Sequence, residues 1–172
     1  MSIELESYKN EVVMRRRDIL KFGLGALMTC GVVACKSAGP TVPEPASLPA
    51  GVGSLSGVWY SPQFEQMYIR QIGDEVRGIY TYKYGGTFEG KIVGNLIKFK
   101  WIDPGDPDVA RRTFKGEGYW QVVKEGDRIF LKGAWGYNDD VMAGGPWEAE
   151  YIRELEDSDP STVEEYRDNE VR

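Results

Sequence analysis

A repeated alternation of apolar and polar residues over positions 66–101 limits the possible folds of this chain more than any other feature. Strict alternation places every second side chain on one face of a β-strand. The alternating runs are separated by three pairs of turn-forming residues, which are Gly73 with Asp74, Gly85 with Gly86, and Gly94 with Asn95. These residue types adopt the backbone angles that tight hairpin turns require. The stretch therefore predicts an antiparallel meander.

The same pattern predicts an all-β domain of eight strands over residues 57–153. The predicted strands are residues 57–60, 64–72, 76–84, 87–93, 96–102, 113–123, 128–136 and 147–153. Glycines such as Gly90, Gly118 and Gly133 fall on the apolar face of their strands. An inward glycine lets a strand bend sharply, and closing the sheet removes its exposed edges. We therefore expect a small antiparallel up-and-down barrel.

Composition and charge limit the possible partners. The chain has 172 residues and a formal net charge of −6, and its length suits one domain with extensions. Residues 36–153 hold fifteen acids and fourteen bases, so this part is nearly neutral. It offers no basic face for phosphates, and nucleic acid is not expected as a partner.

The C-terminal tail, residues 154–172, is acidic. It holds eight acids and two bases, and this composition predicts a disordered or frayed segment. Within it, Ser161 followed by Glu164 has the spacing of a capping box, which predicts the start of a short helix.

Residues 1–34 have the features of an export signal. Three arginines at positions 15–17 precede an apolar run, residues 22–34, which is too short to span a bilayer. Arg16 and Arg17, followed by Asp, Ile, Leu and Lys, resemble the twin-arginine (Tat) export motif. Residues 1–13 contain three glutamates, which do not suit the basic leader of a signal. Translation is therefore predicted to start at Met14.

Cys35 is the predicted membrane anchor. Residues 32–35, Val-Val-Ala-Cys, resemble a bacterial lipobox, in which cleavage precedes the cysteine and its thiol takes the lipid. Several acyl chains, such as palmitate, on one residue give durable anchoring. The Pro-rich residues 35–56 are predicted to form a semi-extended tether. The expected location is a bacterial cell envelope, and Lys36 after the cysteine resembles the sorting signal of Gram-negative outer membranes.

Gly57-Val58-Trp59 resembles the G-x-W signature of the calycin barrels, the lipocalins and avidins. In lipocalins an Arg near the last strand packs across that Trp and closes one end of the barrel. Arg153 stands at the matching place. The resemblance implies a barrel closed by the pair Trp59 and Arg153, with a cation–π contact of about 1 kcal/mol.

The region from Met67 to Trp135 is also similar to a β-rich, uncharacterised module of bacterial surface proteins. The matching residues are Met67, Gln71, Gly73, Val76, Gly78, Tyr80, Gly90, Gly94, Asn95, Phe99, Trp101, Leu131, Gly133 and Trp135. This resemblance implies a β-rich fold and no particular activity.

The connectivity predicts where a site would lie. Short turns at residues 73–75, 94–95 and 124–127 share the rim of Trp59 and Arg153, whereas the long connections 103–112 and 137–146 share the other rim. A closed end, together with an opposite end that carries long loops, is typical of ligand-binding barrels. The candidate rim residues are Asp103, Asp106, Arg111, Asp139 and Asp140.

The rim acids leave two interpretations open. Asp103, Asp106 and Asp108 carry the oxygen ligands that Ca²⁺ prefers. Two of these three precede Pro, as turn-forming residues do. We expect a solvated turn and no metal.

Aromatic side chains expected inside the barrel are the candidates for contacting a ligand. They are Tyr80, Tyr82, Trp101, Trp120 and Trp135. In the alternative, the same rings fill a solid core, because an eight-stranded barrel is just wide enough for its own side chains.

No enzymatic activity and no cofactor are expected. The chain has no His, and lipidation of Cys35 would leave the mature chain without a free thiol, which excludes Ser-His-Asp and Cys-His sites and His-ligated zinc. Glu148 and Glu150 share a face, but the alternation places them outside the barrel. The sequence predicts a membrane-anchored, non-enzymatic envelope lipoprotein whose barrel binds a small apolar or aromatic ligand. The alternative is a packed barrel that serves as a protein-interaction or inhibitor module.

Overall fold

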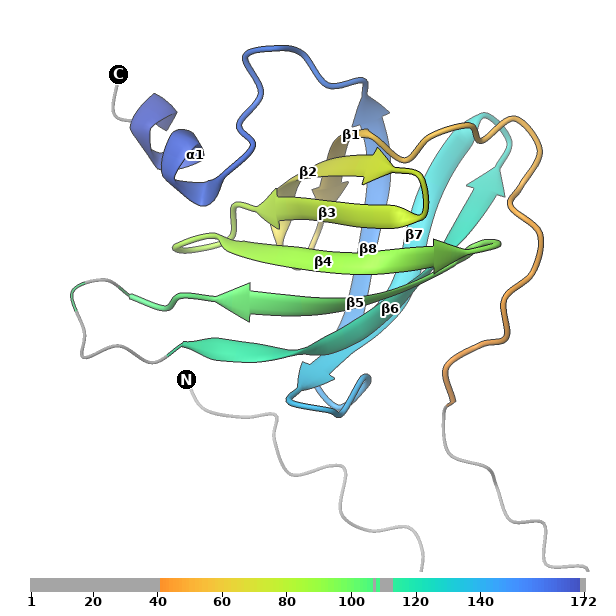
Figure 1. Ribbon diagram of the computed structural model, residues 1–172, viewed down its shortest axis with the longest axis horizontal. Helices are drawn as coiled ribbons and strands as arrows, with labels where there is room; N and C mark the ends of the chain where they lie inside the picture. Colours follow the sequence, from red (N-terminus) through yellow and green to blue (C-terminus); the bar gives the residue numbers. More distant parts are fainter. Residues whose placement is uncertain (1–40, 107, 109–112, 171–172) are drawn as a thin grey trace, which may run out of the picture. The chain divides into compact units, whose positions relative to one another are not determined.

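The computed structural model describes residues 41–106, 108 and 113–170 (Figure 1). Eight antiparallel strands form a closed barrel, in which each strand pairs with the next and β8 pairs with β1. The strands are β1 (Gly57–Ser61), β2 (Glu65–Ile72), β3 (Glu75–Tyr80), β4 (Gly86–Val93), β5 (Leu96–Asp103), β6 (Phe114–Glu125), β7 (Arg128–Tyr137) and β8 (Gly145–Arg153). The predicted all-β meander barrel is confirmed.

The main core lies inside the barrel and follows the period-two pattern. In β5, Phe99 and Trp101 are buried. Lys98, which precedes Phe99, and Lys100, which lies between the two aromatic residues, are exposed. Inward glycines allow close approach: a Cβ on Gly133 would overlap a backbone carbonyl of β6. Every described strand and helix lies in one compact unit, residues 38–172.

The third strand is shorter than predicted. It ends at Tyr80 instead of residue 84. Thr81 interrupts the regular pairing, because its Oγ1 accepts the backbone N–H of Gln66 at 3.1 Å. Lys83 and Gly85 then adopt positive φ angles of 55° and 74°, which turn the chain into β4. Tyr82 therefore lies in the β3–β4 connection and not on the strand face where the alternation placed it.

Residues 46–56 cover the end of the barrel at which β1 begins, where the sequence predicted part of a tether. Val52 and Leu55 are buried in the main core. Ala46 donates its N–H to Asn95 Oδ1 at 2.8 Å, and Asn95 returns its own N–H to the Ala46 carbonyl at 2.8 Å. The structure differs from the prediction here because these apolar side chains complete a core that the barrel end would otherwise expose.

The acidic tail is also more ordered than predicted. It ends in the helix α1 (Val163–Glu170), which lies beside β2 and β3 in Figure 1. Val163 packs with Tyr68 and Ile79 on the outer face of the barrel. Among the described residues, no helix is long and apolar enough to cross a bilayer.

The capping box of α1 is displaced by one residue from the predicted position. Thr162, not Ser161, is the N-cap, and its Oγ1 accepts the N–H of Glu165 at 3.1 Å. The Glu165 carboxylate reaches back to the Ser161 N–H at 2.6 Å. This register places Val163, the first residue of α1, in a buried position against the barrel.

Candidate binding groove

The interior of the barrel is filled with aromatic side chains. Trp59, Trp120 and Trp147 have no exposed surface. Phe99 stacks on Trp120 with ring centroids 3.8 Å apart, and Phe64, from the β1–β2 connection, stacks on Trp147 at 3.9 Å. These contacts are the packed-core arrangement that the sequence left open as an alternative.

The five candidate ligand-contacting residues take different places. Tyr80, Trp101 and Trp120 are buried in the main core, where burial raises the pKa of the Tyr80 hydroxyl. Tyr82 and Trp135 are partly buried and pack against the core. They lie toward the end of the barrel opposite residues 46–56, which we call the open end. Trp101 donates its indole N–H to the Gly136 carbonyl at 3.1 Å, so its polar edge already has a partner.

Trp59 and Arg153 both lie at the end of the barrel that residues 46–56 cover, which we call the covered end. Their side chains, however, have other partners. Tyr151 packs edge-on against Trp59 with centroids 5.3 Å apart, and Trp59 donates its indole N–H to the Leu55 carbonyl at 3.0 Å. The Arg153 guanidinium binds both carboxylate oxygens of Asp159, at 2.7 and 2.8 Å. The expected cation–π pair is not among those that the described residues form. Residues 46–56, rather than an Arg, close this end.

Asp103 and Asp106 at the open rim accept hydrogen bonds from residues just after β5 and from Tyr84. Asp103 Oδ1 accepts the Gly105 N–H at 2.7 Å. Asp106 accepts the Tyr84 hydroxyl at 2.7 Å and the Asp108 N–H at 2.9 Å, and these hydrogen bonds lower the pKa of its carboxyl. Both acids therefore act as turn formers. Arg111 lies outside the described residues.

Asp140 shapes the β7–β8 connection in the same way. Its Oδ1 accepts the N–H groups of Met142 and Ala143, each at 2.9 Å, which lowers the pKa of the carboxyl. Asp139 beside it is exposed. Across the described part of the chain, no three Asp, Glu or Cys side chains gather where they could hold a metal ion.

The two glutamates of β8 lie outside the barrel, as the alternation indicated. Glu148 is exposed, and Glu150 forms a bidentate ion pair with Arg128. The Arg128 hydrogen bonds lower the pKa of Glu150. This carboxylate is committed to a surface ion pair.

A large hollow lies on the outside of the barrel. It has a volume of about 970 Å³ and lies over β3, β4, β5 and β6. A second hollow of about 560 Å³ adjoins it over the same strands, and both are open to solvent on one side. We call the two hollows together the outer groove.

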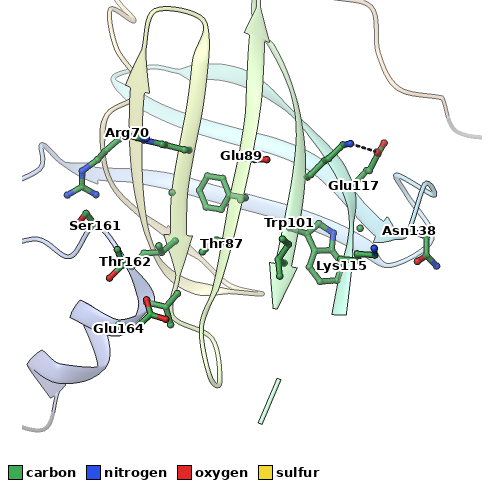
Figure 2. A pocket seen from close by; sticks show the side chains of 18 of the residues that line it. Arg70, Thr87, Glu89, Trp101, Lys115, Glu117, Asn138, Ser161, Thr162 and Glu164 are labelled. Atoms are coloured by element: carbon green, nitrogen blue, oxygen red, sulfur yellow. Dashed lines mark ion pairs between the residues drawn. The ribbon is translucent and has the colours of Figure 1, made fainter. Parts of the chain in front are cut away.

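A row of four charged side chains runs across the floor of the outer groove. Neighbours in the row face each other on adjacent strands: Arg77 with Glu89, Glu89 with Lys100, and Lys100 with Glu117. All four line both hollows. Only Lys100 and Glu117 approach as an ion pair, at 3.8 Å (Figure 2). Within the described chain, Arg77 and Glu89 make no ion pair or side-chain hydrogen bond.

The two walls of the outer groove come from distant parts of the chain. Figure 2 shows Ser161, Thr162 and Glu164 at the start of α1 on one side of the strands and Asn138 on the other. The α1 wall is fixed by Arg70, which donates to the carbonyls of Asp159 and Pro160 at 3.1 and 3.0 Å. The opposite wall folds back over Gly136, where a Cβ would overlap the Asp140 carbonyl.

The floor of the outer groove is richer in bases than in acids. Its charged residues are Arg77, Lys91, Lys98, Lys100 and Lys115, with Glu75, Glu89 and Glu117. The whole chain, in contrast, has a formal charge of −6. The walls add one base, Arg70, and two acids, Asp139 and Glu164. The floor therefore presents positive charge on an otherwise acidic protein.

The sequence contained part of the signal for the outer groove. The alternation placed Lys98 and Lys100 on the outer face of their strand. It gave no indication of the walls, because these depend on the docking of the tail and on the path of the β7–β8 connection.

The structure is a closed eight-stranded barrel with a charged groove on its outer face. No family model, no curated protein and no solved structure matches the chain. The resemblances to calycins and to the bacterial surface module thus remain predictions from short motifs.

Proposed function

We propose that this protein is a non-enzymatic interaction module of a bacterial cell envelope, and that its outer groove receives an extended, acidic segment of a partner protein. The twin-arginine-type signal and the lipid on Cys35 would place the domain on the envelope membrane. The packed interior favours this alternative over a small ligand held inside the barrel, because the rings that would contact such a ligand pack on one another.

The charged row carries the proposal. Adjacent strands lie about 4.8 Å apart, so a row over four strands spans roughly 14 Å, the length of about four extended residues. Arg77 is free to bind a carboxylate, and Lys98 and Lys115 make no ion pair within the described chain. An acidic segment would satisfy these bases and exclude water from the exposed part of Ile102, which lies beside Lys115 on the neighbouring strand.

The shape of the groove favours a chain segment over an enclosed small molecule. Ligand pockets usually bury most of their ligand, whereas both hollows here are open along one side. Among the strands that the structure describes, the closed barrel leaves no free edge, so a partner cannot join this sheet by strand addition and would bind through side chains.

Site-directed cross-linking in the native cell tests this proposal. A photoreactive amino acid replaces Thr87, an exposed residue on the groove floor, and in a matched variant it replaces Ile152, an exposed residue of β8 outside the groove. We expect one discrete protein adduct from position 87, with the cross-link in an acid-rich segment of the partner. Position 152 should give no such adduct.

Two results would contradict the proposal. Equal adducts from positions 87 and 152 would show contact without preference for the groove. A cross-linked segment without acidic residues would exclude the charge complementarity on which the proposal depends.

A further inference from the structure

We infer that the covered end of the barrel rests on a lipid surface, with Ile72 and Val93 entering the zone between the headgroups and the acyl chains. The inference rests on the envelope anchoring proposed above and adds an orientation and a contact surface. The covered end comprises residues 46–56 and the turns that join β2 to β3, β4 to β5 and β6 to β7.

Ile72 and Val93 are unusual among the described apolar residues. They are the two most exposed large apolar side chains, at 65% and 63%. Ile72 is the last residue of β2 and Val93 the last of β4, so both project from the same end. The turn that follows Ile72 contacts the end of β4 just before Val93, because the Ile92 N–H donates to the Asp74 carbonyl at 2.9 Å.

The N-terminal segment joins the barrel at this same end. The reciprocal hydrogen bonds between Ala46 and Asn95 fix the chain beside Val93. Between this point and Cys35 lie residues 36–45, which span at most about 35 Å when fully extended. A lipid on Cys35 would therefore keep the covered end close to the membrane.

Charges around the two aliphatic side chains are balanced. Lys91 lies 3.6 Å from the Asp74 carboxylate. Lys98 and Glu75 are also nearby, in register with Lys91 on the neighbouring strands. Lysine stems lie along apolar surfaces while their ammonium groups stay in water. The surface therefore fits zwitterionic phospholipid and does not require an anionic membrane.

Tethering makes so small a contact effective. Two aliphatic side chains hold a free protein to a bilayer only weakly. A short tether raises the effective concentration of the surface at the membrane, so that a weak contact becomes populated. We expect contact in the tethered protein and little binding of the untethered domain.

Depth-dependent fluorescence quenching tests the contact without relying on lipidation in the cell. Residues 36–172, which contain the whole compact unit and no cysteine, carry a histidine tag in place of Cys35. The tag binds nickel-chelating lipid in phosphatidylcholine vesicles that contain brominated acyl chains. A fluorophore is attached through Ile72→Cys, through Val93→Cys or, as the matched control, through Ile102→Cys at the open rim.

We expect the labels at positions 72 and 93 to be quenched at least about twice as strongly as the label at 102, because only the former enter the interface. Equal quenching at all three positions would overturn the inference. The mass of the mature protein purified from its own cells is measured separately. An unmodified Cys35 there would contradict the proposed anchoring, while the vesicle result would still decide whether the covered end binds lipid.

Discussion

At the scale of single residues, the indole N–H of Trp120 is a costly feature of the core. This N–H is buried and has no hydrogen-bond partner among the described residues. The indole of Trp101, in contrast, donates to the Gly136 carbonyl. A buried donor without a partner costs about 1–3 kcal/mol. Phe88 and Trp147 each form a T-shaped pair with the Trp120 ring, so aromatic packing surrounds an unsatisfied group.

Replacement of each tryptophan by phenylalanine should distinguish the unpartnered N–H of Trp120 from the hydrogen-bonded N–H of Trp101. Trp120→Phe removes the unsatisfied N–H, which offsets part of the lost packing, whereas Trp101→Phe also breaks a hydrogen bond. We expect Trp101→Phe to lower the free energy of unfolding by about 1 kcal/mol more than Trp120→Phe. Urea denaturation measures both values. An equal or larger loss for Trp120→Phe would mean that its N–H has a partner, such as a buried water.

At the scale of elements, the Asp159 carboxylate is one of the groups that hold the tail to the barrel. Asp159 accepts two hydrogen bonds from Arg153 and one from the Glu156 N–H at 2.7 Å. The Arg153 hydrogen bonds are the main cause of the lowered pKa of Asp159. A lowered pKa in the folded state stabilises that state above the unfolded pKa of about 3.9, and this contribution is lost as the pH falls through the folded value.

Asp159→Asn should therefore remove part of the acid sensitivity of the fold. At pH 7 we expect a lower free energy of unfolding than in the wild type, because the charged hydrogen bonds are lost. Between pH 5 and 2 the variant should lose less stability than the wild type. Urea denaturation across this range measures both effects. Asp157→Asn is the matched control, since Asp157 makes no ion pair or side-chain hydrogen bond within the described chain. An unchanged pH profile in Asp159→Asn would contradict the proposed role of the ion pair.

The elements also show what the sequence could predict. Alternation is a local signal, so the strands followed from it, including the inward Phe99 and Trp101. The early end of β3 did not follow, because it depends on a hydrogen bond from Gln66 to the Thr81 side chain. The order of the tail was missed for a similar reason. Composition alone indicated disorder, but Arg70 and Arg153, both on the barrel, supply the partners that fix it.

At the scale of the whole molecule, the candidate site lies on the outside of the barrel, whereas the sequence predicted ligand contacts inside it. The sequence correctly placed Tyr80, Trp101 and Trp120 inside the barrel, but it could not decide between a cavity and a packed core, because that depends on how the rings meet. In the structure, Phe64 of the β1–β2 connection stacks on Trp147 inside the barrel, which favours the packed core. The outer groove combines four strands, the start of α1 and the β7–β8 connection, and no local pattern brings these segments together.

The most direct test of the account is the affinity of the outer groove for the acidic segment that the cross-link identifies, made as a synthetic peptide and measured by calorimetry. Lys100→Glu reverses the central base of the row, and Lys132→Glu reverses a base on β7 outside the groove. We predict that Lys100→Glu weakens binding at least about tenfold, equal to about 1.4 kcal/mol, while Lys132→Glu leaves it unchanged. Unchanged binding by Lys100→Glu, or equal losses in both variants, would contradict a binding site in the outer groove.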